Sequence, residues 1–100
     1  MKEYADKRDV EAFITKCVKE LGIDGIVGKK ALEIMKHAEM ERIPPGRNPI
    51  GQAAAAVYVA SVLTKHRVTQ ASLASFAGVS EAIIRKRYVE LVKGLGYYQN

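Results

Sequence analysis

The sequence contains a single cysteine, Cys17, three prolines and no long run of apolar residues. One cysteine excludes an internal disulfide framework and a cysteine-rich zinc module, and it favours a reduced, intracellular compartment. The longest apolar stretch, residues 53–63, is too short to span a bilayer, and the residues after Met1 lack a signal-peptide pattern. We therefore expect a soluble protein with no membrane partner.

The length and composition indicate one small globular domain. Hydrophobic residues make up 48% of the 100 residues and charged residues 27%, which is enough for one core and typical of a chain that folds. The chain has no internal repeat, low-complexity tract or interdomain linker, so we interpret residues 1–100 as one unit. The apolar spacing is helical and no alternating pattern occurs, which predicts an all-α fold.

Basic residues are concentrated in the second half of the chain. The whole chain carries a net charge of +5, but residues 1–50 contribute only +1 and residues 51–100 contribute +4. A net positive charge alone is common among proteins that never bind nucleic acid. If the protein binds a nucleic acid, the excess of positive charge in residues 51–100 indicates that this half contacts the phosphate backbone.

Five helices are expected from the periodicity and from helix-capping residues. They span residues 9–21, 25–43, 49–63, 70–77 and 81–93. The third helix begins at the pair Asn48-Pro49 and is apolar on nearly every side. A helix without a polar face must be surrounded by other helices, so we expect it to be the central rod of a helical bundle.

The last two expected helices form a candidate helix-turn-helix within residues 69–95. Thr69 and Ser80 are typical N-cap residues, and Gly78 between the helices suits a turn with positive φ. Apolar residues on the final helix recur at the spacing of one buried face: Ile84, Tyr88, Leu91 and Leu95. The outward face would then carry the first turns of that helix, where such motifs contact bases in the major groove.

Arg85 is the strongest candidate for reading a base. Its planar guanidinium can bond O6 and N7 of guanine together, whereas Ala82 and Ile83 offer only apolar contact, for instance to a thymine methyl. Four basic side chains are expected to hold phosphates: Lys65, Arg67, Lys86 and Arg87. The alternative is that residues 85–87 are simply a solvated basic helix face.

Three stretches of the sequence together carry a family resemblance. They are residues 46–61 (GRNPIGQAAAAVYVAS), the pair Thr69-Gln70, and residues 78–88 (GVSEAIIRKRY). They resemble the second cyclin-like repeat of transcription initiation factor B, the family of archaeal factor B and eukaryotic factor IIB, with the archaeal form more similar. The specific feature is a Gly-basic-x-Pro opening of an alanine-rich helix at this distance from a helix-turn-helix.

The resemblance implies a five-helix cyclin-like fold whose helix-turn-helix reads the purine-rich B recognition element upstream of the TATA box. It implies double-stranded promoter DNA and TATA-binding protein as partners. Carried over to this chain, the base-reading residues are Ala82, Ile83 and Arg85, and phosphate contacts lie around Arg67, Gln70 and Ser80. The family often has Val-Thr at positions 82 and 83, so the apolar part of the code is expected to differ while guanine reading is retained.

The resemblance also shows which parts of the family's full-length protein do not fit in this chain. These are a zinc ribbon, a segment that enters RNA polymerase and a first cyclin-like repeat. Contact with RNA polymerase would therefore depend on that missing N-terminal region. A single repeat is expected to bind DNA weakly, because it lacks the gain from tethering to a second DNA-binding unit. The expected location is the cytoplasm of an archaeal cell, or the nucleus if the source is eukaryotic.

No catalytic arrangement and no cofactor motif emerges from the sequence. Glu33, His37 and Glu41 share a helix face at a spacing that suits metal ligands, but a solvated polar stripe explains them equally well, so no metal site is expected. Two alternatives to promoter recognition remain open. One is a cyclin-like module that docks protein partners, and the other is a helix-turn-helix repressor acting as a dimer on a palindrome.

Overall fold

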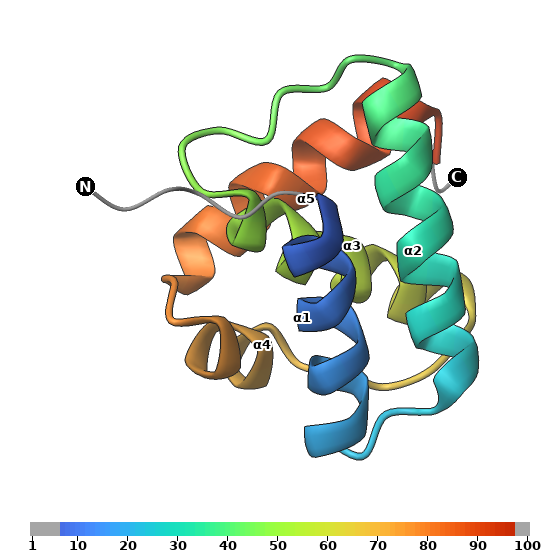
Figure 1. Cartoon of the computed structure of the whole chain (residues 1–100), viewed down its shortest axis with the longest axis vertical. Helices are drawn as coiled ribbons and strands as arrows, with labels where there is room; N and C mark the ends of the chain where they lie inside the picture. The colour runs from blue at the N-terminus through green and yellow to red at the C-terminus, as the bar shows by residue number, and fades with distance from the viewer. Residues whose placement is uncertain (1–6, 98–100) are drawn as a thin grey trace.

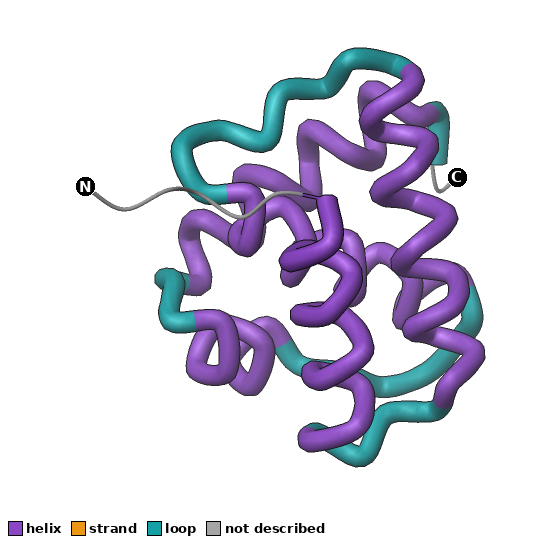
Figure 2. Tube along the Cα trace, in the orientation of Figure 1, coloured by secondary structure: helices purple, strands orange, loops and turns teal. Residues whose placement is uncertain are grey.

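The computed structural model describes residues 7–97, and within them the chain forms five helices and no strand (Figure 1, Figure 2). The helices are α1 (Lys7–Glu20), α2 (Gly25–Met40), α3 (Pro49–Leu63), α4 (Gln70–Ala77) and α5 (Glu81–Leu95). The prediction of an all-α fold with five helices is confirmed. The expectation that the residues after Met1 form no signal peptide concerns residues outside the described part of the chain.

Helix α3 is the centre of the bundle and packs against all four of the other described helices. Ten of its fifteen residues are buried, including the four consecutive alanines 53–56, which are fully inaccessible. Alanine side chains allow neighbouring helices to approach closely, and residues around the whole helix circumference therefore contribute to the core. Despite the apolarity of α3, none of the helices in residues 7–97 has the length and apolar character needed to cross a membrane.

Side-chain caps fix the starts of four helices at the residues expected from the sequence. The caps are Asp24, Asn48, Thr69 and Ser80. The first two accept a hydrogen bond from the N–H two residues later, each at 2.9 Å. The last two accept from the N–H three residues later, at 3.0 and 3.1 Å. These bonds satisfy N–H groups that have no partner within the helix itself.

The second helix ends three residues earlier than the sequence predicts, at Met40 rather than at Ile43. Arg42 adopts a left-handed conformation with φ of 59°, and the N–H of Ile43 donates to the carbonyl of Ala38 at 2.9 Å. This bond closes the helix end in the manner usual for glycine. The expected end was wrong because a non-glycine residue terminates the helix before the two prolines are reached.

The last helix ends two residues later than expected, at Leu95 instead of Lys93. Gly94 continues the helix, and a Cβ at this position would lie 2.5 Å from Cδ1 of Ile43. Gly94 is thus a point of close approach between α5 and the loop after α2. The helix terminates at Gly96, which has φ of 78°.

Cys17 lies on the buried face of α1 and its side chain is fully inaccessible. Desolvation by burial raises the pKa of its thiol to about 11. The thiol is therefore neutral at physiological pH, and since the thiolate is the nucleophile and the metal ligand, Cys17 is an inert core residue.

Candidate nucleic-acid interface

Helices α4 and α5 form a helix-turn-helix that is anchored on the central helix. Gly78 ends α4 in the left-handed conformation, with φ of 74°, and Val79 N–H donates to the carbonyl of Ala74 at 3.1 Å. Leu73 from α4 and Ile84 from α5 are fully buried, and both helices pack on α3. Figure 1 shows α4 and the first turns of α5 side by side at one edge of the bundle. The predicted turn and buried face are both present.

Tyr88 turns toward the core and so sets which face of α5 is outward. Its half-buried ring lies edge-on to that of Tyr58 on α3, with ring centroids 5.2 Å apart. Ile84 and Leu91, on the same side of α5, are completely buried. Arg85 lies on the flank of α5 that adjoins α4, and both Arg85 and Lys86 are exposed.

The guanidinium of Arg85 is exposed and contacts two polar side chains. Its Nη1 donates to Oε1 of Gln70 on α4 at 3.3 Å and lies 4.0 Å from Oε1 of Glu81, one turn earlier on α5. The side chain of Arg85 remains 57% exposed. An exposed cation with two polar contacts thus lies in the N-terminal part of the second helix of the motif, the part that reaches base edges in helix-turn-helix proteins that bind DNA.

Ala82 and Ile83 provide exposed apolar surface in the first turn of the same helix. Ala82 is exposed, and Ile83 is 38% exposed. A Cβ at Gly51 would lie 3.1 Å from Cγ2 of Ile83, so one side of this isoleucine rests against the first turn of α3. The absence of a side chain at Gly51 lets α5 lie close to α3, and Ile83 still presents its other side to solvent.

The remaining predicted contact residues are spread along the loop and the helix starts. Ser80 is exposed, but its Oγ already accepts from Ile83 N–H as the cap of α5. Arg67 is exposed in the loop between α3 and α4, three residues before Gln70. Lys65 is also exposed and lies at the α3 end of this loop, in a left-handed conformation with φ of 61°. The structure therefore joins Gln70 to Arg85 directly and leaves Lys65 at the far end of the loop.

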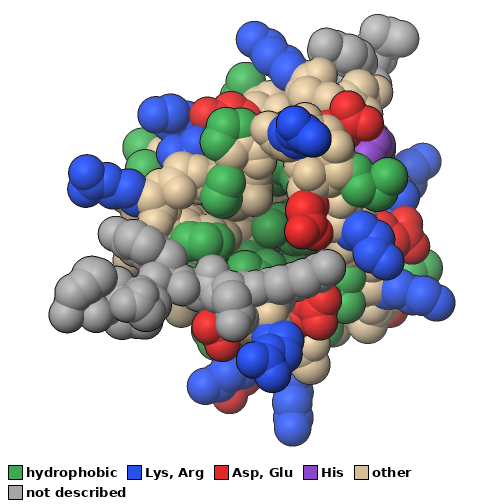
Figure 3. Space-filling model, turned by 45° about the horizontal axis from the view of Figure 1, so that its top comes forward, with side chains coloured by type: hydrophobic (Ala, Val, Ile, Leu, Met, Phe, Trp, Pro, Cys, Tyr) green, Lys and Arg blue, Asp and Glu red, His purple; other side chains and the backbone are tan. Residues whose placement is uncertain are grey.

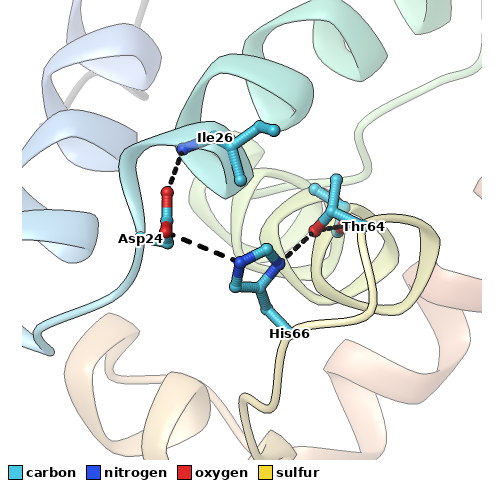
Figure 4. Close-up of polar contacts among 5 residues, drawn as sticks. Asp24, Ile26, Thr64 and His66 are labelled. Atoms are coloured by element: carbon cyan, nitrogen blue, oxygen red, sulfur yellow. Dashed lines mark hydrogen bonds and ion pairs between the residues drawn. The ribbon is translucent and has the colours of Figure 1, made fainter.

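The start of the loop that contains Lys65 makes a contact with α2 that no sequence spacing indicates. The ring of the next residue, His66, lies 3.0 Å from Thr64 Oγ1 through Nδ1 and 3.6 Å from Asp24 Oδ2 through Nε2 (Figure 4). Asp24 also caps α2, so His66 holds the start of the loop against the beginning of that helix (Figure 4).

Arg87 differs from the other basic residues of α5 because it faces inward. Its side chain is only 15% exposed, and its Nη1 donates to Oε1 of Glu90 at 2.7 Å. A Cβ at Gly46, where φ is 82°, would collide with this guanidinium. The glycine of the Gly-basic-x-Pro sequence thus makes room for Arg87. Arg87 lies three residues after Ile84 and four before Leu91, and this spacing on the buried face is the signal in the sequence that its side chain points inward.

Replacing Arg87 with alanine is expected to lower the free energy of unfolding by about 1 to 2 kcal/mol, since it leaves Glu90 unpaired and removes packing against Gly46. The matched control is Lys86→Ala, which removes an exposed neighbouring cation and should leave stability within about 0.5 kcal/mol. Urea denaturation of both variants measures the difference. Equal stability of the two variants would show that the Arg87 contacts contribute nothing.

The polar stripe on α2 is occupied by contacts within the protein. Glu33 pairs with Lys30 at 3.4 Å, and Nε2 of His37 lies 3.8 Å from Oε2 of Glu41. The ring of His37 also meets the ring of Tyr97 edge-on, with centroids 6.3 Å apart. Over residues 7–97, no group of three or more His, Cys, Asp or Glu side chains could hold a metal ion.

An open groove of about 730 Å³ lies between α1, α2 and the loop before α3. Its floor is apolar, with Leu32, Met35 and Ile43, and its edges carry acidic and basic side chains together, including Glu39 and Arg42. Figure 3 shows a face on which hydrophobic side chains are surrounded by charges of both signs. Mixed charge does not favour a polyanion, so the outer face of α5 remains the better candidate for a nucleic acid.

The fold and the site define an all-α five-helix domain that ends in a helix-turn-helix. The family model described as "Transcription factor TFIIB repeat" matches residues 5–94, and the chain belongs to this family. It is a family of transcription factors rather than enzymes, and its repeat has the cyclin-like fold.

Curated relatives agree with this assignment. The chain is 50% identical over 84 residues to "Transcription initiation factor IIB" of Archaeoglobus fulgidus, covering 84% of this chain and 26% of the relative. Similar proteins with the same name from Methanocaldococcus jannaschii and Saccharolobus shibatae are 45% and 41% identical over 83 and 87 residues, or 83% and 87% of this chain. This chain spans 12% and 28% of those two relatives, and about a quarter of the first.

Proposed function

We propose that the chain is a promoter-recognition module that corresponds to the second cyclin-like repeat of a factor B. In this proposal the start of α5 enters the major groove of double-stranded DNA and reads the purine-rich B recognition element upstream of a TATA box. TATA-binding protein binds the adjacent DNA and acts as the partner. RNA polymerase contact belongs to segments outside this repeat.

The observation that carries the proposal is the exposed guanidinium of Arg85 in the N-terminal part of α5, where it contacts Gln70 and Glu81. Ala82 and Ile83 are exposed in the first turn of the same helix and would supply apolar contacts for a thymine methyl. Lys86, Arg67 and Lys65 are exposed and can bind phosphates, and the family resemblance adds Gln70 and Ser80 as expected phosphate contacts. The excess of positive charge in residues 51–100 adds attraction for a polyanion.

The experiment is a titration of fluorescent duplexes with the 100-residue chain, with and without TATA-binding protein. One duplex carries a purine-rich element upstream of TATA, and its control carries a scrambled element. We expect tighter binding to the first duplex, a further gain with TATA-binding protein, and a steep loss of affinity with salt. Binding with no sequence preference and no salt dependence would instead support a protein-docking module.

Sedimentation of the same chain separates the remaining alternative. A stable dimer that prefers symmetric half-sites would support a repressor and contradict the proposal.

A further inference from the structure

The contacts of the Arg85 guanidinium all involve one of its three nitrogens. Both the hydrogen bond to Gln70 and the approach to Glu81 use Nη1. Within residues 7–97, neither contact occupies the edge formed by Nε and Nη2. That edge carries two parallel N–H donors, the arrangement that bonds O6 and N7 of guanine together.

Gln70 can hold Arg85 in only one way. A guanidinium has donors and no acceptor, so the amide must present its oxygen, as it does at 3.3 Å. The bond joins two helices, because the residues are fifteen positions apart in the sequence. The direction of the arginine is thereby tied to the packing of α4 on α5.

Glu81 places a negative charge near the guanidinium of Arg85. A solvated arginine has many rotamers and can turn toward a phosphate, which adds affinity without adding specificity. A carboxylate at 4.0 Å from Nη1 attracts the guanidinium to its present position and repels an approaching phosphate. The Nε–Nη2 edge can still meet a neutral base.

We propose that Gln70 and Glu81 are positioning residues that make Arg85 a reader of guanine rather than a phosphate contact. The proposal rests on the proposed function, because it assumes that α5 enters the major groove. It assigns Gln70 a role different from the phosphate contact expected from the family resemblance: this side chain acts on DNA through Arg85. The ligand of the site is a guanine that presents O6 and N7 to the Nε–Nη2 edge.

The test is a double-mutant cycle between positions 70 and 85, using duplexes that differ only at the base pair read by Arg85. Gln70→Met keeps the side-chain length but loses the acceptor. We expect it to reduce discrimination at that pair by about three- to tenfold, with non-specific affinity and salt slope unchanged. In the Arg85→Ala background the same change should have no further effect on discrimination.

Conservative variants and a control on the same helix test the mechanism. Gln70→Glu keeps an acceptor oxygen and is expected to retain discrimination. Ser75→Ala changes an exposed α4 residue and should behave as wild type in every titration. NMR relaxation of the Arg85 Nε–Hε group in the free protein gives a readout without DNA, and its order should fall in Gln70→Met.

The outcomes that contradict this inference differ from those that contradict the proposed function. An equal loss on all duplexes with a shallower salt slope in Gln70→Met would show that Gln70 contacts phosphate itself. Additive losses in the cycle would also overturn the positioning role. Wild-type chain that binds every duplex equally would instead refute the proposed function and the inference with it.

Discussion

Replacing Arg85 with alanine is expected to remove most of the preference for one base pair of the bound element, at a cost of about 1 to 3 kcal/mol on the preferred duplex. The loss on a duplex that already lacks this base pair should be much smaller. The reason is that a bidentate bond to guanine distinguishes bases, whereas attraction to phosphates does not. Fluorescence titration of the two duplexes at a fixed salt concentration measures both losses.

Two matched variants show whether the preference for one base pair depends on the planar pair of N–H donors of Arg85 or on its positive charge. Arg85→Lys keeps the positive charge but loses the planar pair of donors, so affinity for all sequences should persist without the preference. Lys86→Ala removes an exposed charge from the next position, and we expect a uniform loss and a salt slope lower by about one. A uniform loss from Arg85→Ala would instead make this residue a phosphate contact.

The largest expected effect on stability comes from Leu91→Ala. Leu91 is fully buried on α5. Helices α5 and α2 are the two that pack most extensively on α3. Removing a buried leucine side chain loses its transfer free energy and leaves a cavity, which typically costs about 2 to 5 kcal/mol. Because small domains have only about 5 to 15 kcal/mol of stability, a sizeable part of the total would be lost.

Val89→Ala is the matched control on the same helix, because Val89 is 44% exposed. We expect it to change the free energy of unfolding by less than about 0.5 kcal/mol. Thermal and urea denaturation followed by circular dichroism compare the two variants with wild type. A loss in Leu91→Ala no larger than that in Val89→Ala would contradict the assignment of Leu91 to the core.

Local chemistry explains why most of the fold is predictable from the sequence. Asp24, Asn48 and Ser80 each precede a helix because their side chains accept bonds from the first free N–H groups, and this preference depends only on residue type. The alanine-rich third helix is predictable as the buried centre because it has no polar face. The end of α2 is not predictable, since nothing about Arg42 marks it for a left-handed conformation.

The candidate site is only partly predictable for a related reason. The outward direction of Arg85 follows from the helical spacing of the buried residues on the same helix. The inward direction of Arg87 also follows from that spacing, although its charge favours the prediction of an exposed phosphate contact. The contacts of Gln70 with Arg85 and of His66 with Asp24 depend on how distant elements pack. Tertiary geometry alone determines such contacts, and no local pattern encodes them.

The central position of α3 limits how small a peptide can be and still keep the structure of the helix-turn-helix. Helix α4 has eight residues, whereas an isolated helix in water is marginal below about 12 to 15 residues. Helices α4 and α5 both rest on α3, which in turn requires α1 and α2 to cover its other sides. An excised two-helix peptide would therefore lose its shape, and denaturation of the chain should abolish helix content and the proposed DNA recognition in one cooperative transition.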